Sequence, residues 1–344
     1  SHESRLHFTE KQSKEPTKTD PDSVKLQEYF PDTPLFRYTR ARYLDRMMVI
    51  DELVGQVIKD LEQAGELENT FIFYFGDHGG VLPRSKGYIY ESGLHVPLVI
   101  RIPENFRSLA SRKFGSRTDG FVEFVDFGPT VLSLAGVDQP EGIDGRPFLG
   151  LDADPKRVDQ RDETFGYADR FDEKYELVRS LRVGDFKYIR NFEPFYPDGL
   201  QNNYRYKCLA YQQWRQLHQE GKLSGASSQF YEPKAAESLF DLSVDPDETN
   251  NLASDPAQAK KIADKKMREL ANKAGKGKKD EKGKTDDKTA TDDKKSGDAS
   301  KKSDVKTPDS SKGSKTDPKS GDKKTEPEKG EADKKKSDKK KSDK

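Results

Sequence analysis

Side chains that could carry out chemistry gather in one stretch of the chain, residues 69–102. Its G-D-H-G-G motif places Asp77 and His78 directly after residues 70–75, an apolar, aromatic and β-branched run that predicts a buried strand of a parallel sheet. The glycines let the backbone turn sharply and approach a ligand closely. Because open α/β sheets bind ligands at the carboxyl ends of their strands, we expect the acid and the imidazole at a ligand site.

The loop after this motif adds charged side chains at the same place. Arg84, Lys86 and Glu91 lie between the first apolar run and a second one, residues 96–102. One acid, one imidazole and one lysine are thus carried by a single loop. A purely structural interpretation also fits the residues alone, with Asp77 capping a turn and His78 as a hydrogen-bonded loop residue.

Taken with its flanks, this stretch resembles the second signature region of the sulfatases, which belong to the alkaline-phosphatase superfamily. The resemblance is carried by strand-G-D-H-G followed by K-G-x-x-Y-E-S-G-x-x-V-P-L-V-I. In that family the acid and its Asn or His neighbour bind a divalent cation, commonly calcium, and the lysine contacts the sulfate. The resemblance therefore implies Asp77 and His78 as metal ligands, and Lys86 as a catalytic and substrate-binding residue.

The chemistry of these side chains suits those roles unequally. A carboxylate oxygen is a good ligand for a hard cation such as Ca²⁺, and an ammonium is a compact charge for an anionic ester. Imidazole suits zinc or copper better, so His78 either ligates the metal or hydrogen-bonds the sulfate. The resemblance also implies a catalytic and substrate-binding role for His2, near the leaving-group oxygen. A histidine at the start of a chain can equally have no role.

A long helix is expected before the first apolar run. Thr33 is a suitable cap, Pro34 suits the first helical position, and Gly65 suits the position after the last turn. Between them, one helical face carries apolar residues: Met47, Ile50, Val54, Val57, Ile58 and Leu61. Asp45 and Asp51 lie on this helix and are interpreted as structural.

The second half of the chain predicts smaller elements in the order that sulfatases show. Residues 120–126 are expected as a strand, with a helix from Pro129 and Asp126 as its cap. Residues 177–192 predict a hairpin that turns at Gly184-Asp185, and residues 238–242 a further strand. The acidic segment 245–252 lacks EF-hand spacing, so we interpret it as a turn rather than a calcium loop. Residues 194–233 form either a rim that sets substrate choice or a packing insert.

These elements predict an α/β fold like that of alkaline phosphatase, with a mixed or parallel sheet and flanking helices, incomplete in this chain. A small antiparallel C-terminal subdomain and a disordered tail follow. The expected boundaries are 1–150 for the catalytic-domain portion, 151–272 for the subdomain and 273–344 for the tail. The tail has no Phe, Tyr, Trp, Leu, Ile or Met, so it cannot bury enough apolar surface to fold.

Composition excludes several classes of protein. No run of 18 apolar residues exists, so we expect no membrane span. The formal net charge of zero combines a mildly acidic body with a basic tail, and the charges of the tail are mixed, which argues against a nucleic-acid partner. The single cysteine, Cys208, excludes an internal disulfide framework. Nothing in the sequence indicates an oligomeric state.

One feature of sulfatases is missing. Their nucleophile is a formylglycine made from Cys or Ser in C/S-x-P/A-S/T-R, and the chain has no such motif. The paired early aspartates that complete the metal site are missing too. We therefore expect this chain to be the C-terminal portion of a sulfatase, with its nucleophile upstream of Ser1, and to be inactive alone.

The resemblance implies a sulfuric ester hydrolase whose substrate is a sulfated small molecule or glycan, most similar to enzymes acting on sulfated sugars. Secreted or periplasmic locations suit such substrates. A non-catalytic sulfatase-like protein that binds glycans is one alternative. A phosphatase, phosphodiesterase or phosphonate hydrolase of the same superfamily is another, although five histidines are few for a two-zinc site.

Overall fold

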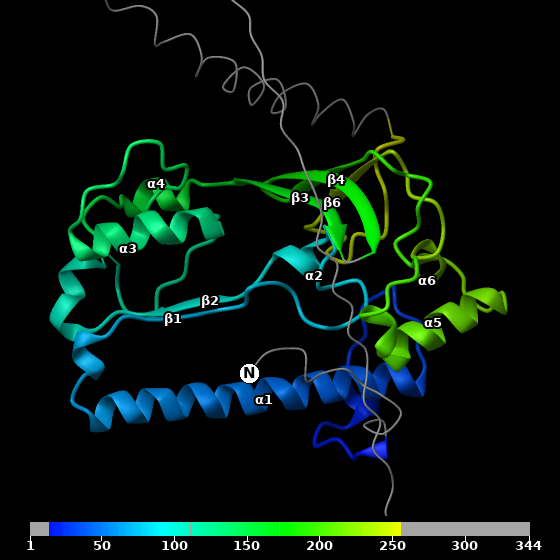
Figure 1. Cartoon of the computed structure of the whole chain (residues 1–344), viewed down its shortest axis with the longest axis horizontal. Helices are drawn as coiled ribbons and strands as arrows, with labels where there is room; N and C mark the ends of the chain where they lie inside the picture. The colour runs from blue at the N-terminus through cyan, green and yellow to red at the C-terminus, as the bar shows by residue number, and fades with distance from the viewer. Residues whose placement is uncertain (1–13, 111, 172, 256–344) are drawn as a thin grey trace, which may run out of the picture. The chain divides into compact units, whose positions relative to one another are not determined.

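The computed structural model describes residues 14–110, 112–171 and 173–255. All of them belong to the first of two compact units, Ser1–Gly283, and the second unit, Lys284–Lys344, contains none of them. His2 and the predicted tail lie outside the described residues. The helices are α1 (Pro34–Gln63), α2 (Glu91–Leu94), α3 (Phe127–Ala135), α4 (Pro155–Asp159), α5 (Leu209–Gln219) and α6 (Ala226–Gln229); the strands are β1 (Ile72–Phe75), β2 (Leu98–Arg101), β3 (Glu163–Phe171), β4 (Lys174–Val183), β5 (Phe186–Asn191) and β6 (Glu237–Asp241) (Figure 1).

The long helix α1 begins and ends where the sequence predicts. The hydroxyl of Thr33 accepts a hydrogen bond from the backbone N–H of Phe36 at 3.2 Å, and Pro34 occupies the first turn. The helix ends at Gln63 with Ala64 as its C-cap, and Gly65 follows with a φ of 71°, a left-handed conformation that glycine adopts without a Cβ penalty. The predicted cap, start and stop are confirmed.

The apolar run 70–75 contains β1, so the predicted strand is confirmed. The parallel pairing predicted for it is wrong where this strand pairs with β2. β1 pairs antiparallel with β2, from Ile72 opposite Arg101 to Phe75 opposite Leu98. The chain leaves β1, makes the loop 76–97 and returns along β2 (Figure 1). An apolar run indicates a strand that is at least partly buried, but it does not encode the direction of the neighbouring strand.

One face of this strand pair packs on the segment that follows it. Phe73, Leu98 and Ile100 contact a buried cluster that includes Phe148 and Val158. The helix α3 contributes Phe127, whose ring centroid lies 6.2 Å from that of Phe73. A helix therefore covers one face of the β1–β2 pair, as expected for a layered α/β architecture.

Residues 120–126 do not form the predicted strand. A 3₁₀ turn at Phe124–Asp126 leads directly into α3. The carboxylate of Asp126 is buried and accepts hydrogen bonds from the backbone N–H groups of Glu123, at 3.1 Å, and Arg146, at 2.8 Å. The guanidinium of Arg161 lies 3.3 Å from it. Asp126 therefore has a structural role at the start of α3.

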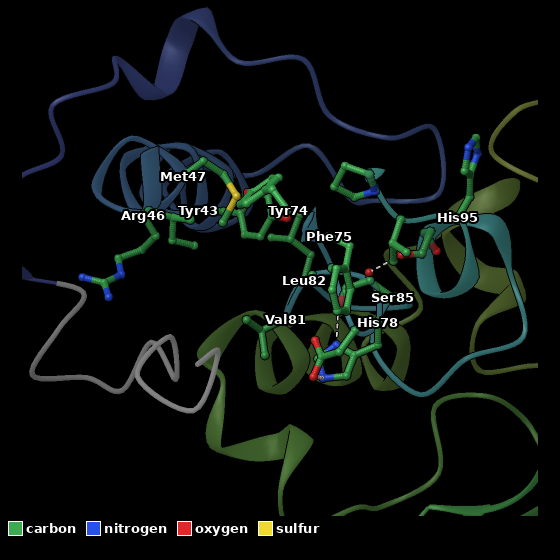
Figure 2. Close-up of a pocket in the computed structure, with 18 of the residues that line it drawn as sticks. Tyr43, Arg46, Met47, Tyr74, Phe75, His78, Val81, Leu82, Ser85 and His95 are labelled. Atoms are coloured by element: carbon green, nitrogen blue, oxygen red, sulfur yellow. Dashed lines mark hydrogen bonds and ion pairs between the residues drawn. The ribbon is translucent and has the colours of Figure 1, made fainter. Parts of the chain in front are cut away.

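A cavity of about 640 Å³ lies between α1 and β1. Figure 2 shows Tyr43 and Met47 of α1, Tyr74 and Phe75 of β1, and His78 of the following loop around it. The apolar face that the sequence predicts for α1 is present, but its C-terminal half lines this cavity and is only partly covered. Packing on α1 is thus concentrated in its N-terminal part, from Pro34 to Asp45, where its buried residues lie: Phe36, Thr39, Ala41 and Asp45.

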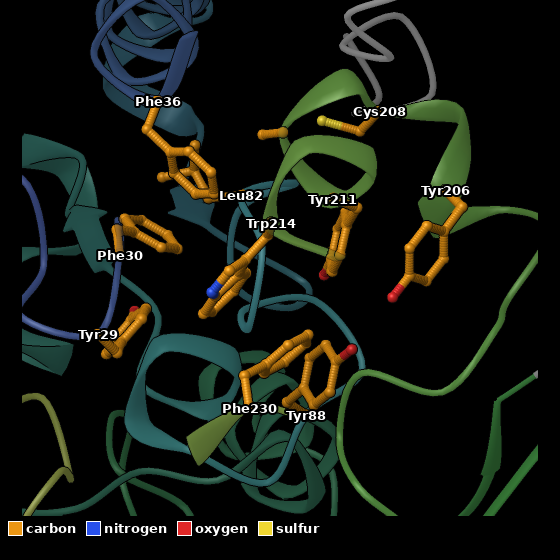
Figure 3. Close-up of a cluster of buried hydrophobic side chains, with 11 residues drawn as sticks. Tyr29, Phe30, Phe36, Leu82, Tyr88, Tyr206, Cys208, Tyr211, Trp214 and Phe230 are labelled. Atoms are coloured by element: carbon orange, nitrogen blue, oxygen red, sulfur yellow. The ribbon is translucent and has the colours of Figure 1, made fainter. Parts of the chain in front are cut away.

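The main aromatic core joins α1 to α5 (Figure 3). Trp214 is completely buried, and its ring stacks on that of Phe230 at a centroid distance of 4.2 Å. Phe36 approaches the same indole edge-on at 5.8 Å. The indole N–H donates to the carbonyl of Ser227 at 2.8 Å, so this large side chain is buried without an unpaired donor.

The C-terminal part forms an antiparallel sheet with the strand order β3-β4-β5-β6. The predicted hairpin is confirmed as β4 and β5, which turn at Gly184 with a φ of 55°, and the predicted short strand is confirmed as β6. Along β5, buried and partly buried residues alternate. Among the described helices, none has the length and apolar character needed to cross a membrane.

We expect the two halves of α1 to respond differently to truncation. Phe36→Ala should lower the free energy of unfolding by about 3–5 kcal/mol, because a core ring leaves a cavity that its neighbours do not fill. Val57→Ala on the same helix should change it by less than about 0.5 kcal/mol, because Val57 is 54% exposed. Urea unfolding followed by circular dichroism measures both. Equal losses for the two variants would contradict this description of α1.

Candidate functional site on the loop between β1 and β2

The loop 76–97 folds back on itself and gathers the residues that the sequence singles out. The backbone N–H of Gly79 donates to the carbonyl of Gly93 at 2.9 Å, and that of Lys86 donates to the carbonyl of Gly80 at 3.0 Å. A Cβ at Gly79 would lie 1.9 Å from the carbonyl oxygen of Ser92, so only glycine fits there. The loop is therefore closed on itself, and the backbone of Lys86 is held against Gly80, two residues after His78.

Asp77 and His78 lie side by side directly after β1. The Nδ1 of His78 is 2.8 Å from the carbonyl oxygen of Gly79, and because a carbonyl only accepts, this nitrogen is the donor. In the neutral ring, Nε2 is then the basic nitrogen. It lies 3.5 Å from Oδ2 of Asp77, whose side chain is 66% exposed. This arrangement suits either a protonated imidazole or a cation shared with the carboxylate.

The donor set fits part of a metal site. A carboxylate oxygen and an imidazole nitrogen, whose other nitrogen is fixed by a hydrogen bond, form a typical pair of metal ligands. No group of three His, Cys, Asp or Glu side chains that could hold a metal exists among the described residues. Asp77 and His78 therefore supply two donors, and a complete shell needs further ones.

Lys86, the predicted sulfate contact, meets a residue of the 194–233 segment. Its Nζ lies 3.5 Å from the hydroxyl of Tyr204 and 5.2 Å from the centre of that ring. Lys86 and Tyr204 are both partly buried. The structure thus brings Asp77, His78 and Lys86 onto one folded loop, whereas His2 lies outside the described residues.

A buried ion cluster behind the loop was not found by sequence reasoning. Lys187 of β5 is 1% exposed, and its Nζ lies 3.0 Å from Oε1 of Glu91 and 3.0 Å from Oε1 of Glu248. Arg182 of β4 also pairs with Glu91. Lysine is rarely buried, so the residue type alone does not predict this cluster. The alternation along β5 is a signal that places Lys187 on the same inward face as Ile189.

The same cluster holds the turn after β6. The other carboxylate oxygen of Glu248 accepts a hydrogen bond from the backbone N–H of Glu91 at 2.6 Å, and Glu248 has a positive φ of 53°. Arg84 is buried, donates to the carbonyls of Asp247 and Glu248 at 2.9 Å each, and lies 3.5 Å from the ring centre of Tyr90. The acidic segment predicted as a turn therefore anchors the site loop.

The cluster shifts the two carboxyl pKa values in opposite directions. Burial alone would raise the pKa of Glu91, but Lys187, Arg182 and His95 hold it below its ordinary value. For Glu248, burial prevails over Lys187 and Arg84, and its pKa is raised. Glu91 thus stabilises the fold above its ordinary pKa and loses this effect as the pH falls. Glu248 loses its contribution as the pH rises.

Comparison with known proteins identifies the family. Residues 1–137 match the family model described as Sulfatase. The chain is 37% identical over 240 residues to an ulvan-active sulfatase of Formosa agariphila. The matched region covers 70% of this chain and 39% of that protein. The chain belongs to the sulfatase family. It is also 26% identical over 254 residues to the human N-sulphoglucosamine sulphohydrolase, covering 70% of this chain and 49% of that enzyme.

A solved structure supports the fold of this sulfatase-family chain. A protein of Bacteroides fragilis described as a candidate sulfatase matches 79% of the chain and 52% of its own length, with 19% identity and a TM-score of 0.50. The likeness agrees with the predicted α/β fold of alkaline-phosphatase type. The chain spans less than half of the length of the two curated relatives named above.

We expect the buried cluster of this sulfatase-family chain to be sensitive to loss of its lysine. Lys187→Met should lower the free energy of unfolding by about 3–5 kcal/mol at pH 7, because Glu91 and Glu248 lose their shared buried cation. The loss should be smaller at pH 4, because Glu248, whose pKa is raised, then folds protonated and no longer needs the cation. Urea unfolding at the two pH values measures this.

A matched control is Lys222→Met, which removes the exposed pair with Glu220. It should change stability little at either pH, because water and salt screen exposed charges. A Lys187→Met variant as stable as this control, or one equally destabilised at both pH values, would contradict the electrostatic account of the cluster.

Proposed function

We propose that this chain carries part of the active site of a sulfuric ester hydrolase that acts on sulfated sugars. The observation that carries the proposal is the folded loop 76–97, which holds a carboxylate, an imidazole and an ammonium group within one hydrogen-bonded unit. The family match supports the same reaction class. Since the chain spans only part of its relatives, the activity belongs to a polypeptide that includes further sulfatase segments.

Asp77 and His78 are the proposed ligands of a divalent cation, with calcium first. A cation bound there would supply positive charge for the negative charge that develops on the transferring sulfuryl group. The exposed carboxylate of Asp77 supplies a hard oxygen, and the hydrogen bond between Nδ1 of His78 and the carbonyl of Gly79 leaves Nε2 on the side of Asp77, at 3.5 Å from Oδ2. The alternative is that His78 donates a hydrogen bond to the sulfate.

Lys86 is the proposed sulfate contact. Its ammonium binds the anionic group before reaction and stabilises the added charge during transfer. His2 is the proposed proton donor or orienting group for the leaving alcohol. The nucleophile, a formylglycine in this proposal, lies outside the chain, whose only cysteine is buried beside α5 in K-C-L-A.

Sulfated sugars are the proposed substrate class because of the names of the relatives. They include the ulvan-active sulfatase and an N-acetylglucosamine-6-O-sulfatase of Bacteroides thetaiotaomicron, to which the chain is 27% identical. A secreted or periplasmic location is proposed on the same ground, since polymeric sulfated sugars are met outside the cytoplasm.

The metal assignment is tested with calcium titrations. Isothermal titration of CaCl₂ into the chain should show weak binding, because the chain supplies part of the shell. Asp77→Asn should weaken it further, at least about tenfold, because an amide oxygen lacks the negative charge of a carboxylate. Asp138→Asn, which changes another exposed acid, serves as the control and should leave binding unaltered. Equal affinity of wild type and Asp77→Asn would refute the assignment.

His78→Ala separates the two roles of the histidine. If His78 ligates the metal, the variant loses calcium affinity as Asp77→Asn does. If it contacts the sulfate instead, calcium binding persists and the affinity for sulfate falls. We expect the first result, because the hydrogen bond to Gly79 directs Nε2 toward Asp77.

We further expect the chain alone to bind sulfate esters without hydrolysing them, because its sequence has no C/S-x-P/A-S/T-R motif. The measurement is release of 4-nitrophenol from 4-nitrophenyl sulfate in the presence of calcium. Release above the buffer rate that disappears in Lys86→Ala would show that a nucleophile exists within residues 1–344.

A further inference from the structure

Tyr204 is the residue of the 194–233 segment that meets the proposed sulfate contact. Its hydroxyl lies 3.5 Å from Nζ of Lys86, and its ring centre lies 5.2 Å from the same atom. An anion bound to that ammonium is therefore within contact distance of the phenol. The tyrosine is only partly buried, so part of its surface remains open to a ligand.

The turn that carries Tyr204 is firmly attached to the site loop. Arg205 is 4% exposed, its guanidinium lies 3.9 Å from the ring centre of Tyr88 and 4.5 Å from that of Phe171, and its Nη2 donates to the carbonyl of Gly87 at 3.0 Å. Gly87 has a φ of 75°, and a Cβ there would lie 2.8 Å from both Arg205 and Phe171. Such close packing fixes the turn against the residues that flank Lys86.

A second set of contacts fixes the turn against the sheet. Asn202 is fully buried, donates to the carbonyl of Phe171 at 3.2 Å and accepts from the backbone N–H of Arg205 at 2.9 Å. The rings of Phe171 and Tyr204 meet edge-on at 5.9 Å. Tyr204 is thus held on both sides, and its position beside Lys86 is a property of the fold.

We propose that Tyr204 contacts the sugar ring of the substrate and sets the preference for a sulfated sugar over free sulfate. The inference rests on the proposed function, in which Lys86 binds the sulfate. A sugar attached to that sulfate lies next to a rigid aromatic ring, which offers a large apolar face and a hydroxyl at low entropic cost. Lys86 then binds the sulfate group, and Tyr204 contacts the sugar that carries it.

The test compares two ligands on the full chain in calcium-containing buffer: N-acetylglucosamine 6-sulfate and inorganic sulfate. Wild type should bind the sulfated sugar more tightly. Tyr204→Ala should weaken binding of the sulfated sugar about tenfold, about 1.4 kcal/mol, and leave the affinity for inorganic sulfate unchanged. Tyr204→Phe keeps the ring and should stay within about threefold of wild type for both ligands.

Controls separate the possible explanations. Lys86→Ala should weaken both ligands, and Tyr167→Ala, at a tyrosine that is 75% exposed on β3, should weaken neither. Circular dichroism checks folding, and Tyr204→Leu replaces Tyr204→Ala if the smaller side chain prevents folding. Leucine fills the space beside Phe171 but lacks the aromatic face, so it should still weaken binding of the sulfated sugar selectively.

Two results would overturn the inference while leaving the proposed function intact. In the first, variants without the ring keep the wild-type preference for the sulfated sugar. In the second, they weaken both ligands equally, which would mean that Tyr204 acts only through Lys86. If wild type binds neither sulfated ligand, the proposed function and the inference fail together.

Discussion

The structure around the site depends on one buried cation. Lys187 leaves water to lie between Glu91 and Glu248, and each of these three charges would cost several kcal/mol to bury alone. Glu91 begins the short helix of the site loop, Lys187 lies on β5, and Glu248 lies in the turn after β6. Because the charges compensate one another only when all three segments are in place, the site loop and the C-terminal sheet must form together. The subdomain is therefore part of the site's scaffold.

The two ends of the loop are supported unequally. The segment from Arg84 to Glu91 is fixed by buried charges, aromatic rings and hydrogen bonds to distant residues. Asp77, at the other end, points an exposed carboxylate toward the histidine next to it. The segment that carries Lys86 is thus preorganised, whereas the carboxylate that we propose as a metal ligand is exposed. In the proposed function, this division corresponds to an anion contact formed within this chain and a metal site that needs ligands from further segments.

The sequence was most informative where local rules decide the structure. Thr33, Pro34 and Gly65 define α1 through capping and backbone preference, and the hairpin at Gly184 follows from its turn residues. It was least informative where distant segments meet. The direction of β2 beside β1 depends on the path of the loop, and the burial of Lys187 depends on carboxylates from two other segments. Residues 120–126 look like a strand but form none among the described elements, because capping interactions of Glu123 and Asp126 start a helical turn instead.

The contact between Lys86 and Tyr204 joins the site loop to a segment that lies far away in the sequence. An ammonium group is a compact point charge, so the proposed sulfate contact of Lys86 does not by itself distinguish one sulfate ester from another. Discrimination between the groups attached to the sulfate then needs a second residue. Tyr204, which we propose for this role, lies 118 residues further along the chain. Since Arg205 and Asn202 attach that segment to the loop and the sheet, the residue at position 204 can change without moving the lysine. In our proposal, anion binding and sugar preference are therefore assigned to separate parts of the chain, which meet at the contact between Lys86 and Tyr204.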